Sequence, residues 1–302
     1  MAVLICGSLA FDTIMTFEGR FAEQLLPEQL HILNVSFLVP SLRRDFGGCA
    51  GNIAYSLQLL GGTPLPMAAL GSDGADYLAR LESLGIGTQH VLQVEGAYTA
   101  QAMIMTDLDN NQITAFHPGA MMQAHGNRIE PAARPQASLG IIAPDGRDAM
   151  LQHAAQFQAA GIPFVFDPGQ GLPMFNGEEL AHFVEQASWV TVNDYEGKML
   201  CERTGTSLAE LSAKVQGLVV TLGAEGCDVW VQGEKTHVPA VQPTAVVDPT
   251  GCGDAWRGAL LFGLEQGWPL VRCAQLGNRL GALKVAERGP QNYVLDFDPA
   301  IA

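Results

Sequence analysis

The sequence has few basic residues. Its 302 residues include only 16 Lys and Arg against 31 Asp and Glu, which gives a formal net charge of −15 at pH 7. A surface with this charge repels phosphate backbones and anionic lipids, so we expect no binding to nucleic acid or to membranes. A bound phosphate must therefore be held by local groups, because the overall charge opposes it.

Several sequence motifs are also missing. The first apolar run ends after about six residues, so we expect neither a signal peptide nor a membrane span there. There is no G-x-x-x-x-G-K-[ST] motif, which excludes a Walker-type phosphate loop, and Gly7 does not begin a G-x-G-x-x-G motif. No C-x-x-C pair occurs, which argues against a zinc site or a disulfide framework and favours a reducing, cytoplasmic location. The cysteines are Cys6, Cys49, Cys201, Cys227, Cys252 and Cys273.

Short apolar stretches recur along the chain, each closed by Gly, Pro, Asp or Asn. They cover residues 2–6, 66–70, 139–143, 163–166, 189–193 and 218–222. Such runs are typical of strands that are buried on both faces of a parallel sheet. Helical patterns at 52–60 and 145–160 lie between them, so the sequence predicts an α/β fold with helices on both faces of the sheet.

Two regions interrupt this alternation. Residues 34–39, and residues 99–106 and 112–117 on either side of a polar turn at 109–111, read as strands without intervening helices. They predict a small antiparallel sheet, and a flap that leaves the first strand at Gly7-Ser8 would lie over a ligand at the carboxyl ends of the strands. We therefore expect a large domain of residues 1–12, 47–96 and 118–302, and a β lid of residues 13–46 and 97–117.

The most informative motif is Asp248-Pro249-Thr250-Gly251-Cys252-Gly253-Asp254, which opens an apolar helix. The backbone N–H groups of Gly251, Cys252 and Gly253, together with the helix N-terminus, form a plausible anion hole. Asp254 would lie in the first helical turn, where it could accept a proton from a hydroxyl that attacks a bound phosphate. The alternative is that Asp254 only balances the helix dipole.

A second glycine motif, Gly47-Gly48-Cys49-Ala50-Gly51-Asn52, opens another helix. Its glycines allow close backbone approach to a ligand, and Asn52 offers both a donor and an acceptor for sugar hydroxyls. A tight turn with Asn52 as the N-cap explains the same pattern.

Two further segments carry polar groups at the ends of strands. Thr221, Gly223 and Gly226 could hold phosphate, although a glycine-rich hairpin explains them equally well. Asn193 and Glu196 could bind Mg²⁺ through water, but their N-x-x-E spacing is also that of a helix capping box. Both interpretations stay open at this point.

These four motifs, in this order, resemble the ribokinase-like (PfkB) kinase family over nearly the whole chain. The stretches Gly19 to Pro27, Ser36 to Val39, Phe116 to Met121 and Asp254 to Arg257 are most similar to bacterial adenosine kinases. The resemblance implies a three-layer ribokinase-like fold with a small antiparallel β lid. It also implies ATP, Mg²⁺ steered through water by Asn193 and Glu196, and a K⁺ site near Asp248 and residues 286–291 that would raise activity.

The resemblance also implies roles for residues in the nucleoside site. Asp12, Asn52 and the Gly48 backbone would hold the ribose hydroxyls, while Phe116 would stack on the base. The residues that would approach the nucleoside are Ser8, Ser36 and Gln170. Three positions depart from the family pattern: Gly169 replaces one of two paired glutamines, Met103 stands where an aromatic lid residue is expected, and Cys49 replaces the lysine of many ribokinases.

The leading functional hypothesis is an ATP-dependent kinase that phosphorylates the 5′-hydroxyl of adenosine in purine salvage, with Asp254 as the base. Alternatives are a sugar kinase of the ribokinase or fructokinase type, a kinase for inosine, guanosine or cytidine, and a nucleoside-binding sensor without catalysis. A turnover assay with ATP and a panel of substrates would separate them.

The expected lid strand also suggests an assembly. Val35, Phe37 and Val39 alternate with Asn34, Ser36 and Leu38. One face of the strand would therefore be apolar, while Ser36 on the other face would face the nucleoside. An exposed apolar sheet face usually marks a partner surface, which predicts a homodimer joined through the two lids. The alternative is that nearby apolar side chains, namely Phe21, Leu25 and Leu26, fold back over it.

Overall fold

The computed structural model describes residues 1–25, 32, 34–130 and 136–299. Within these residues, a nine-stranded sheet has the order β13-β12-β11-β10-β9-β8-β1-β4-β5. Its strands are β1 (Ala2–Cys6), β4 (Pro64–Leu70), β5 (Val91–Gln93), β8 (Ala137–Ile142), β9 (Phe164–Phe166), β10 (Trp189–Asn193), β11 (Gly217–Thr221), β12 (Cys227–Val231) and β13 (Glu234–Val238). All neighbours from β11 to β5 pair in parallel, whereas the β11–β12 and β12–β13 pairs at the other edge are antiparallel.

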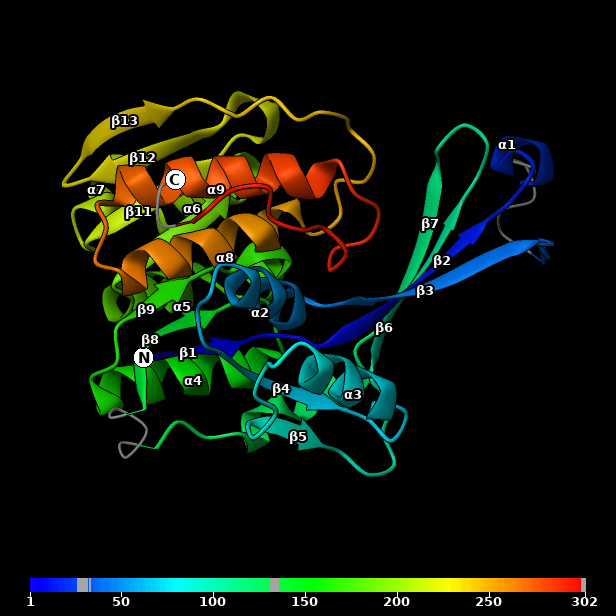
Figure 1. Cartoon of the computed structure of the whole chain (residues 1–302), viewed down its shortest axis with the longest axis horizontal. Coiled ribbons are helices and arrows are strands. Elements are labelled where there is room, and N and C mark those ends of the chain that lie inside the picture. Colours follow the sequence, from blue (N-terminus) through cyan, green and yellow to red (C-terminus); the bar gives the residue numbers. More distant parts are fainter. Residues whose placement is uncertain (26–31, 33, 131–135, 300–302) are drawn as a thin grey trace.

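Helices cover both faces of this sheet (Figure 1). The bounds are α2 (Cys49–Leu59), α3 (Ala75–Ser83), α4 (Arg147–Ala160), α5 (Gly177–Gln186), α6 (Asp194–Thr204), α7 (Leu208–Ser212), α8 (Cys252–Glu265) and α9 (Leu270–Val285). Strand β1 shows how the layers are joined, because alternate side chains of a strand point to opposite faces. Val3 and Ile5 pack into the core of α2, α3, α8 and α9, whereas Leu4 and Cys6 pack into the core of α4, α5, α6 and α7. The predicted three-layer α/β architecture is confirmed.

A second sheet, which we call the small sheet, extends from the carboxyl end of β1 (Figure 1). Its order is β3-β2-β6-β7, formed by β2 (Ala10–Thr16), β3 (Ser41–Gly47), β6 (Ala100–Thr106) and β7 (Gln112–His117), with the short α1 (Phe21–Gln24) at its tip. Its pairs are antiparallel except for β2 and β6, which run parallel. The turn expected at 109–111 is present, and Asn110 in it has a positive φ of 61°.

The predicted strand at 34–39 is wrong. Those residues form no strand, and the strand positions are taken by β3, which follows them, and by β2, which the sequence analysis missed. The apolar alternation has another cause: the ring of Phe37 packs edge-on against Phe17 and Phe21, at centroid distances of 5.0 and 5.3 Å. Phe21 therefore covers part of the predicted apolar face, while Leu26, also expected there, lies outside the described residues.

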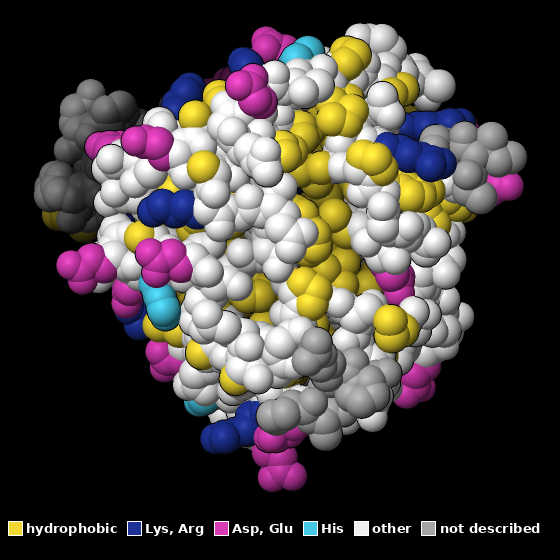
Figure 2. Space-filling model, turned by 90° about the vertical axis from the view of Figure 1, so that its left-hand side faces the viewer, with side chains coloured by type: hydrophobic (Ala, Val, Ile, Leu, Met, Phe, Trp, Pro, Cys, Tyr) yellow, Lys and Arg dark blue, Asp and Glu magenta, His cyan; other side chains and the backbone are white. Residues whose placement is uncertain are grey.

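The other end of the molecule, opposite the small sheet, is seen in Figure 2. Hydrophobic side chains gather there in a central band with acidic and basic side chains around it. Among the described residues, no helix has the length and apolar character needed to span a bilayer. All six cysteines are free thiols in this structure.

Candidate active site

A cleft of about 860 Å³ lies between the carboxyl ends of the parallel strands and one face of the small sheet. Most of the predicted site residues line it. These are Ser8, Asp12, Gly48, Asn52, Phe116, Gln170, Asn193, Glu196, Thr221, Gly251, Gly253 and Asp254. The first of these residues, Ser8, and the last, Asp254, are more than 240 positions apart in the chain. The fold thus brings together the two glycine motifs that the sequence analysis singled out.

Asp254 stands in the first turn of α8, behind Gly251, whose φ of 78° only glycine adopts readily. Its Oδ2 accepts a 2.8 Å hydrogen bond from Asn52 Nδ2. Burial raises the pKa of Asp254 to about 6, while the hydrogen bond from Asn52 and the charge of Arg257 oppose this increase. A carboxylate with this raised pKa is still ionised at pH 7 and accepts a proton more readily than an ordinary aspartate.

The amide of Asn52 is itself held by a buried network. Gln291 Nε2 donates to Asn52 Oδ1 at 3.0 Å and to the hydroxyl of Tyr77 at 2.9 Å. That hydroxyl in turn donates to the Gly47 carbonyl oxygen at 2.6 Å. Because Asn52 Oδ1 accepts from Gln291, its Nδ2 faces Asp254. Asn52 therefore orients Asp254 in this structure, a contact that the predicted sugar-binding role did not include.

Asp12 lies on β2 where the small sheet faces the cleft. It is directly opposite Asp45 on β3 and Ala102 on β6, and Ala102 is opposite Phe116 on β7. Residues opposite one another share a face of the sheet, so the carboxylate of Asp12 and the ring of Phe116 lie on the same side and both line the cleft. Burial and the charges of Asp45, Asp254 and Asp248 raise the pKa of Asp12 to about 6, and Arg43 opposes them.

The groups at the end of β10 form a closed local pair. Asn193 Oδ1 accepts from the Glu196 backbone N–H at 2.7 Å, and Glu196 Oε2 accepts from the Asn193 N–H at 2.8 Å. The capping box that the spacing allowed is thus present at the start of α6. Both side chains also line the cleft, and burial together with the charge of Asp167 raises the pKa of Glu196.

Some predicted residues lie elsewhere. Ser36 is exposed and is not part of the cleft, because the strand expected to carry it does not form. Gly223 and Gly226 have φ of 58° and 100° in the turn between β11 and β12, as the hairpin alternative required, and only Thr221 of that motif lines the cleft. The N–H group of Cys252 donates to the Pro249 carbonyl oxygen at 3.2 Å within the turn.

A model of the pfkB family carbohydrate kinases matches residues 19–296. The chain belongs to that family. It is therefore a phosphotransferase with an alcohol group as acceptor, and the resemblance noted in the sequence and its ribokinase-like fold are confirmed.

Relatives of this pfkB-family kinase include nucleoside kinases. The one from Methanocaldococcus jannaschii is 29% identical over 298 residues, which cover 98% of this chain and 94% of the relative. The structure of the Burkholderia thailandensis nucleoside kinase in complex with inosine is 50% identical, with a TM-score of 0.86, and the match covers 97% of this chain and 93% of that one. The adenosine kinase from Sinorhizobium meliloti is 22% identical, with a TM-score of 0.75 and coverage of 99% and 97%; it is similar in fold.

The active site of this kinase also contains residues that the sequence analysis did not assign. Arg257, one turn after Asp254, pairs with Asp167 through Nε–Oδ2 and Nη2–Oδ1 contacts of 2.6 and 2.8 Å, and both side chains are buried. Asp145 also lines the cleft, and its burial raises its pKa to about 8. A signal for Arg257 was present, because an arginine among the apolar residues of a helix must find a partner.

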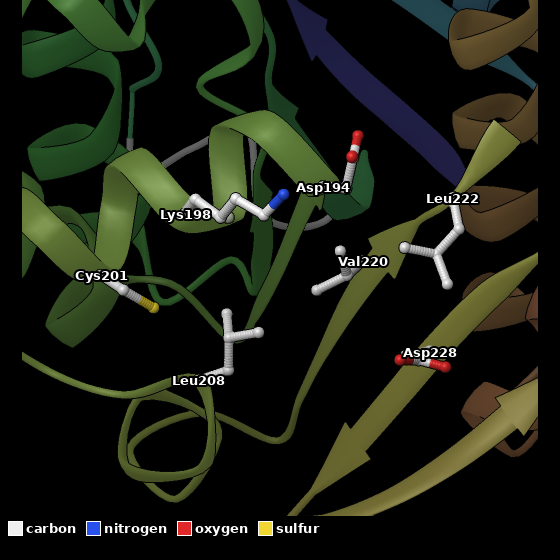
Figure 3. A pocket seen from close by; sticks show the side chains of 8 residues that line it. Asp194, Lys198, Cys201, Leu208, Val220, Leu222 and Asp228 are labelled. Carbon is white, nitrogen blue, oxygen red and sulfur yellow. The ribbon is translucent and has the colours of Figure 1, made fainter.

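A smaller hollow of about 400 Å³ lies apart from this site, between α6 and strands β11 and β12 (Figure 3). Asp194 and Lys198 of α6 stand on one side of it, and Val220 and Asp228 of the strands on the other. None of the predicted site residues lines it.

Proposed function

We propose that this kinase transfers the γ-phosphoryl group of ATP to the 5′-hydroxyl of a purine nucleoside. The observation that carries the proposal is that one cleft is lined by Asp12 and Phe116 from the small sheet and by Asp254 from the first turn of α8. A carboxylate suits vicinal ribose hydroxyls, and an aromatic ring suits a purine. Support also comes from the 50% identical nucleoside kinase, whose structure contains inosine, and from its complex with ADP and inosine.

In the proposed mechanism, Asp254 accepts the proton of the attacking hydroxyl. Asn52 keeps its carboxylate in place, and the burial that raises its pKa makes it a better proton acceptor than an exposed aspartate. The N-terminus of α8 faces the same cleft through Gly251 and Gly253, where backbone N–H groups and the helix dipole stabilise the charge on the transferred phosphoryl group. Cys252, grouped with these glycines in the sequence, supports the turn instead.

We propose that Asp12, with Ser8 and the Gly48 backbone beside it, binds the ribose, and that Phe116 and Gln170 contact the base. Phe116 remains 49% exposed, so one side of the base site is open. Among the described residues, Gln170 is the one glutamine that lines the cleft. We therefore expect the site to accept inosine as well as adenosine, without a preference for adenosine. The four-stranded sheet begins at Ala10, before the lid bound expected at residue 13, and its β3 ends at Gly47, one residue after the bound expected at 46. We propose that this sheet acts as the lid over the site.

ATP brings Mg²⁺, which neutralises phosphate charge when bound. Among the described residues no three His, Cys, Asp or Glu side chains group as direct metal ligands. Glu196 and Asn193 line the cleft as a carboxylate and an amide, which suits contact with the ion through water. Thr221 lies beside them at the end of β11. The K⁺ site expected near Asp248 is a separate question, because the ammonium of Lys284 already donates a hydrogen bond to the Asp248 carbonyl oxygen.

A substrate panel tests the proposal. We expect ATP-dependent phosphorylation of both inosine and adenosine, with ribose and fructose turned over at a much lower kcat/KM because they leave the base contacts unused. The measurement is ADP release at saturating Mg²⁺–ATP, with the product's phosphate position assigned by ³¹P NMR. Efficient turnover of a free sugar would support the sugar-kinase alternative, and nucleoside binding without any turnover would support a sensor.

We also propose a homodimer through the outer face of the small sheet. Leu42, Met15, Met105 and Ile113 lie directly opposite one another across its four strands, which places them on one face. This face is the one turned away from Asp12 and the cleft, and Leu42 is 62% exposed on it. An apolar row across a sheet face marks a partner surface.

Leu42→Asp is expected to convert the dimer to a monomer, because it places a charge within the apolar contact. Sedimentation equilibrium measures the mass, and Val231→Asp, an exposed valine at the end of β12, is the matched control. A wild-type protein that sediments as a monomer at micromolar concentration would contradict the proposal. The cytoplasmic location, and the division of the chain into a large domain and a lid at the expected bounds, stay predictions.

A further inference from the structure

Lys284 is the most deeply buried lysine or arginine in the described part of the chain. It lies in the last turn of α9 and its side chain is fully buried, which lysine side chains rarely are unless they are paired. Its Nζ donates to two carbonyl oxygens, that of Asp248 at 2.8 Å and that of Glu287 at 3.0 Å. An ammonium buried at this depth must be held by such acceptors, so the site is built around the charge.

The two carbonyls belong to loops that flank the start of α8. The Asp248 carboxylate joins the same loops, since its Oδ1 accepts from the Thr250 N–H at 2.9 Å and its Oδ2 from the Gly289 N–H at 3.0 Å. Three residues beyond Asp248 is Gly251, on which Pro290 packs so closely that a Cβ there would lie 2.6 Å from Pro290 Cβ. The segment after α9 thus lies against the anion-binding turn, at the end that faces the small sheet (Figure 1).

The same segment is also connected by hydrogen bonds to Asp254, the proposed general base. Gln291, two residues after Gly289, holds the amide of Asn52, and Asn52 donates to Asp254. The loop that the ammonium fixes therefore supports both the N–H groups at the start of α8 and the orientation of the carboxylate. A displacement of either by about 1 Å is enough to slow a reaction on the order of 10²-fold.

Carbonyl oxygens from two converging loops are also the ligands that a bound K⁺ takes in place of its water shell. We propose that the ammonium of Lys284 is a built-in monovalent cation at this loop, and that phosphoryl transfer by this kinase does not require K⁺. Lys284 is a positioning residue: it touches no substrate and acts through the loops it joins. We therefore no longer expect the activation by K⁺ that the sequence suggested, because the carbonyl oxygens of Asp248 and Glu287 already bind the ammonium of Lys284.

The first test uses the unmodified protein and rests on the proposed function. Turnover of inosine with Mg²⁺–ATP is measured in KCl and in tetramethylammonium chloride of equal ionic strength, because the organic cation is too large for a site of this kind. We expect the same kcat in both salts. A clear rise of kcat with K⁺ would overturn the proposal.

The second test uses Lys284→Ala, which removes the ammonium and leaves the two carbonyls. We expect kcat to fall on the order of 10²-fold in tetramethylammonium chloride and to recover partly in KCl or NH₄Cl. A residue that served only to fill the core would show no such recovery. Lys198→Ala, in the smaller hollow between α6 and strands β11 and β12, is the matched control, and its kcat should be the same in all of these salts.

The melting temperature separates this inference from the proposed function. A cation that binds the folded variant stabilises it, so the melting temperature of Lys284→Ala should rise with KCl while that of the wild type does not, whatever substrate is used. A folded variant whose melting temperature and turnover both ignore K⁺ would refute the inference. If the variant fails to fold, the comparison of salts on the unmodified protein still decides it.

Discussion

Asp254→Asn is expected to lower kcat by at least about 10²-fold, the usual effect of removing a general base. The asparagine keeps the shape of the side chain at the start of α8 but has no carboxylate to accept the proton. The KM for ATP should change little, because the N–H groups of Gly251 and Gly253 are unaltered. Steady-state kinetics with inosine and adenosine measure both parameters.

The pH dependence provides an independent signature of the same base. Because burial raises the pKa of Asp254 to about 6, the carboxylate is ionised above that pH and protonated below it. The wild-type kcat should therefore fall as the pH drops through about 6 and level off above it. Asp254→Asn should lose this acidic limb, since the residual rate no longer depends on that proton.

Asp228→Asn is a suitable control for this pair of measurements. Asp228 is an aspartate on β12 that is paired with Lys235 and His237 and does not line the cleft. It should leave kcat and its pH profile unchanged. Turnover near the wild-type rate in Asp254→Asn would remove Asp254 from the chemistry and leave it only the helix-dipole role.

The large sheet could be predicted from the sequence because burial on both faces requires consecutive apolar residues. The runs at 2–6 and 189–193 match β1 and β10 residue for residue. The small sheet was harder, since its strands have one face in the cleft and one outside. Strand β2 carries Asp12 among apolar neighbours and was missed, whereas the apolar alternation at 34–39 reflects the packing of Phe37 on Phe17 and Phe21.

The candidate site could be predicted where its chemistry lies in short motifs. Asp254 and Asn52 come from two glycine-rich helix starts, and the structure brings them to 2.8 Å of one another. The supporting contacts could not be predicted, because they join distant segments without a local pattern. Gln291 holds Asn52 across 239 positions, and Lys284 reaches back to Asp248 over 36. A lysine in the last turn of a helix is ordinary, and only burial distinguishes this one.

The second large effect is expected at Asp12. Asp12→Ala should raise the KM for the nucleoside on the order of 10²-fold, the loss expected when charge-assisted hydrogen bonds to ribose hydroxyls are removed. The KM for ATP should stay unchanged, because Asp12 lies on the small sheet, away from Asn193 and Thr221. Equal effects on both substrates would contradict this placement.

A substrate that lacks a hydroxyl sharpens the test. For 2′-deoxyinosine, one of the contacts to Asp12 is already missing, so Asp12→Ala should cost less with the deoxynucleoside than with inosine, and the two losses should not add. Asp45→Ala is the matched control: Asp45 is directly opposite Asp12 on β3 but is paired with Arg43 at 3.2 Å and does not line the cleft. It should not show this dependence on the 2′-hydroxyl.

A raised KM in Asp12→Ala could also result from loss of folding, but the electrostatics of Asp12 argue against that explanation. Its pKa in the folded chain, about 6, lies above the ordinary aspartate value, because burial and the neighbouring carboxylates of Asp45, Asp254 and Asp248 disfavour its charge. The stability linked to this group is fully present below the unfolded pKa and is lost as the pH rises through about 6. At pH 7 the ionised Asp12 therefore destabilises the fold, so Asp12→Ala should keep or raise the melting temperature while binding of the nucleoside weakens.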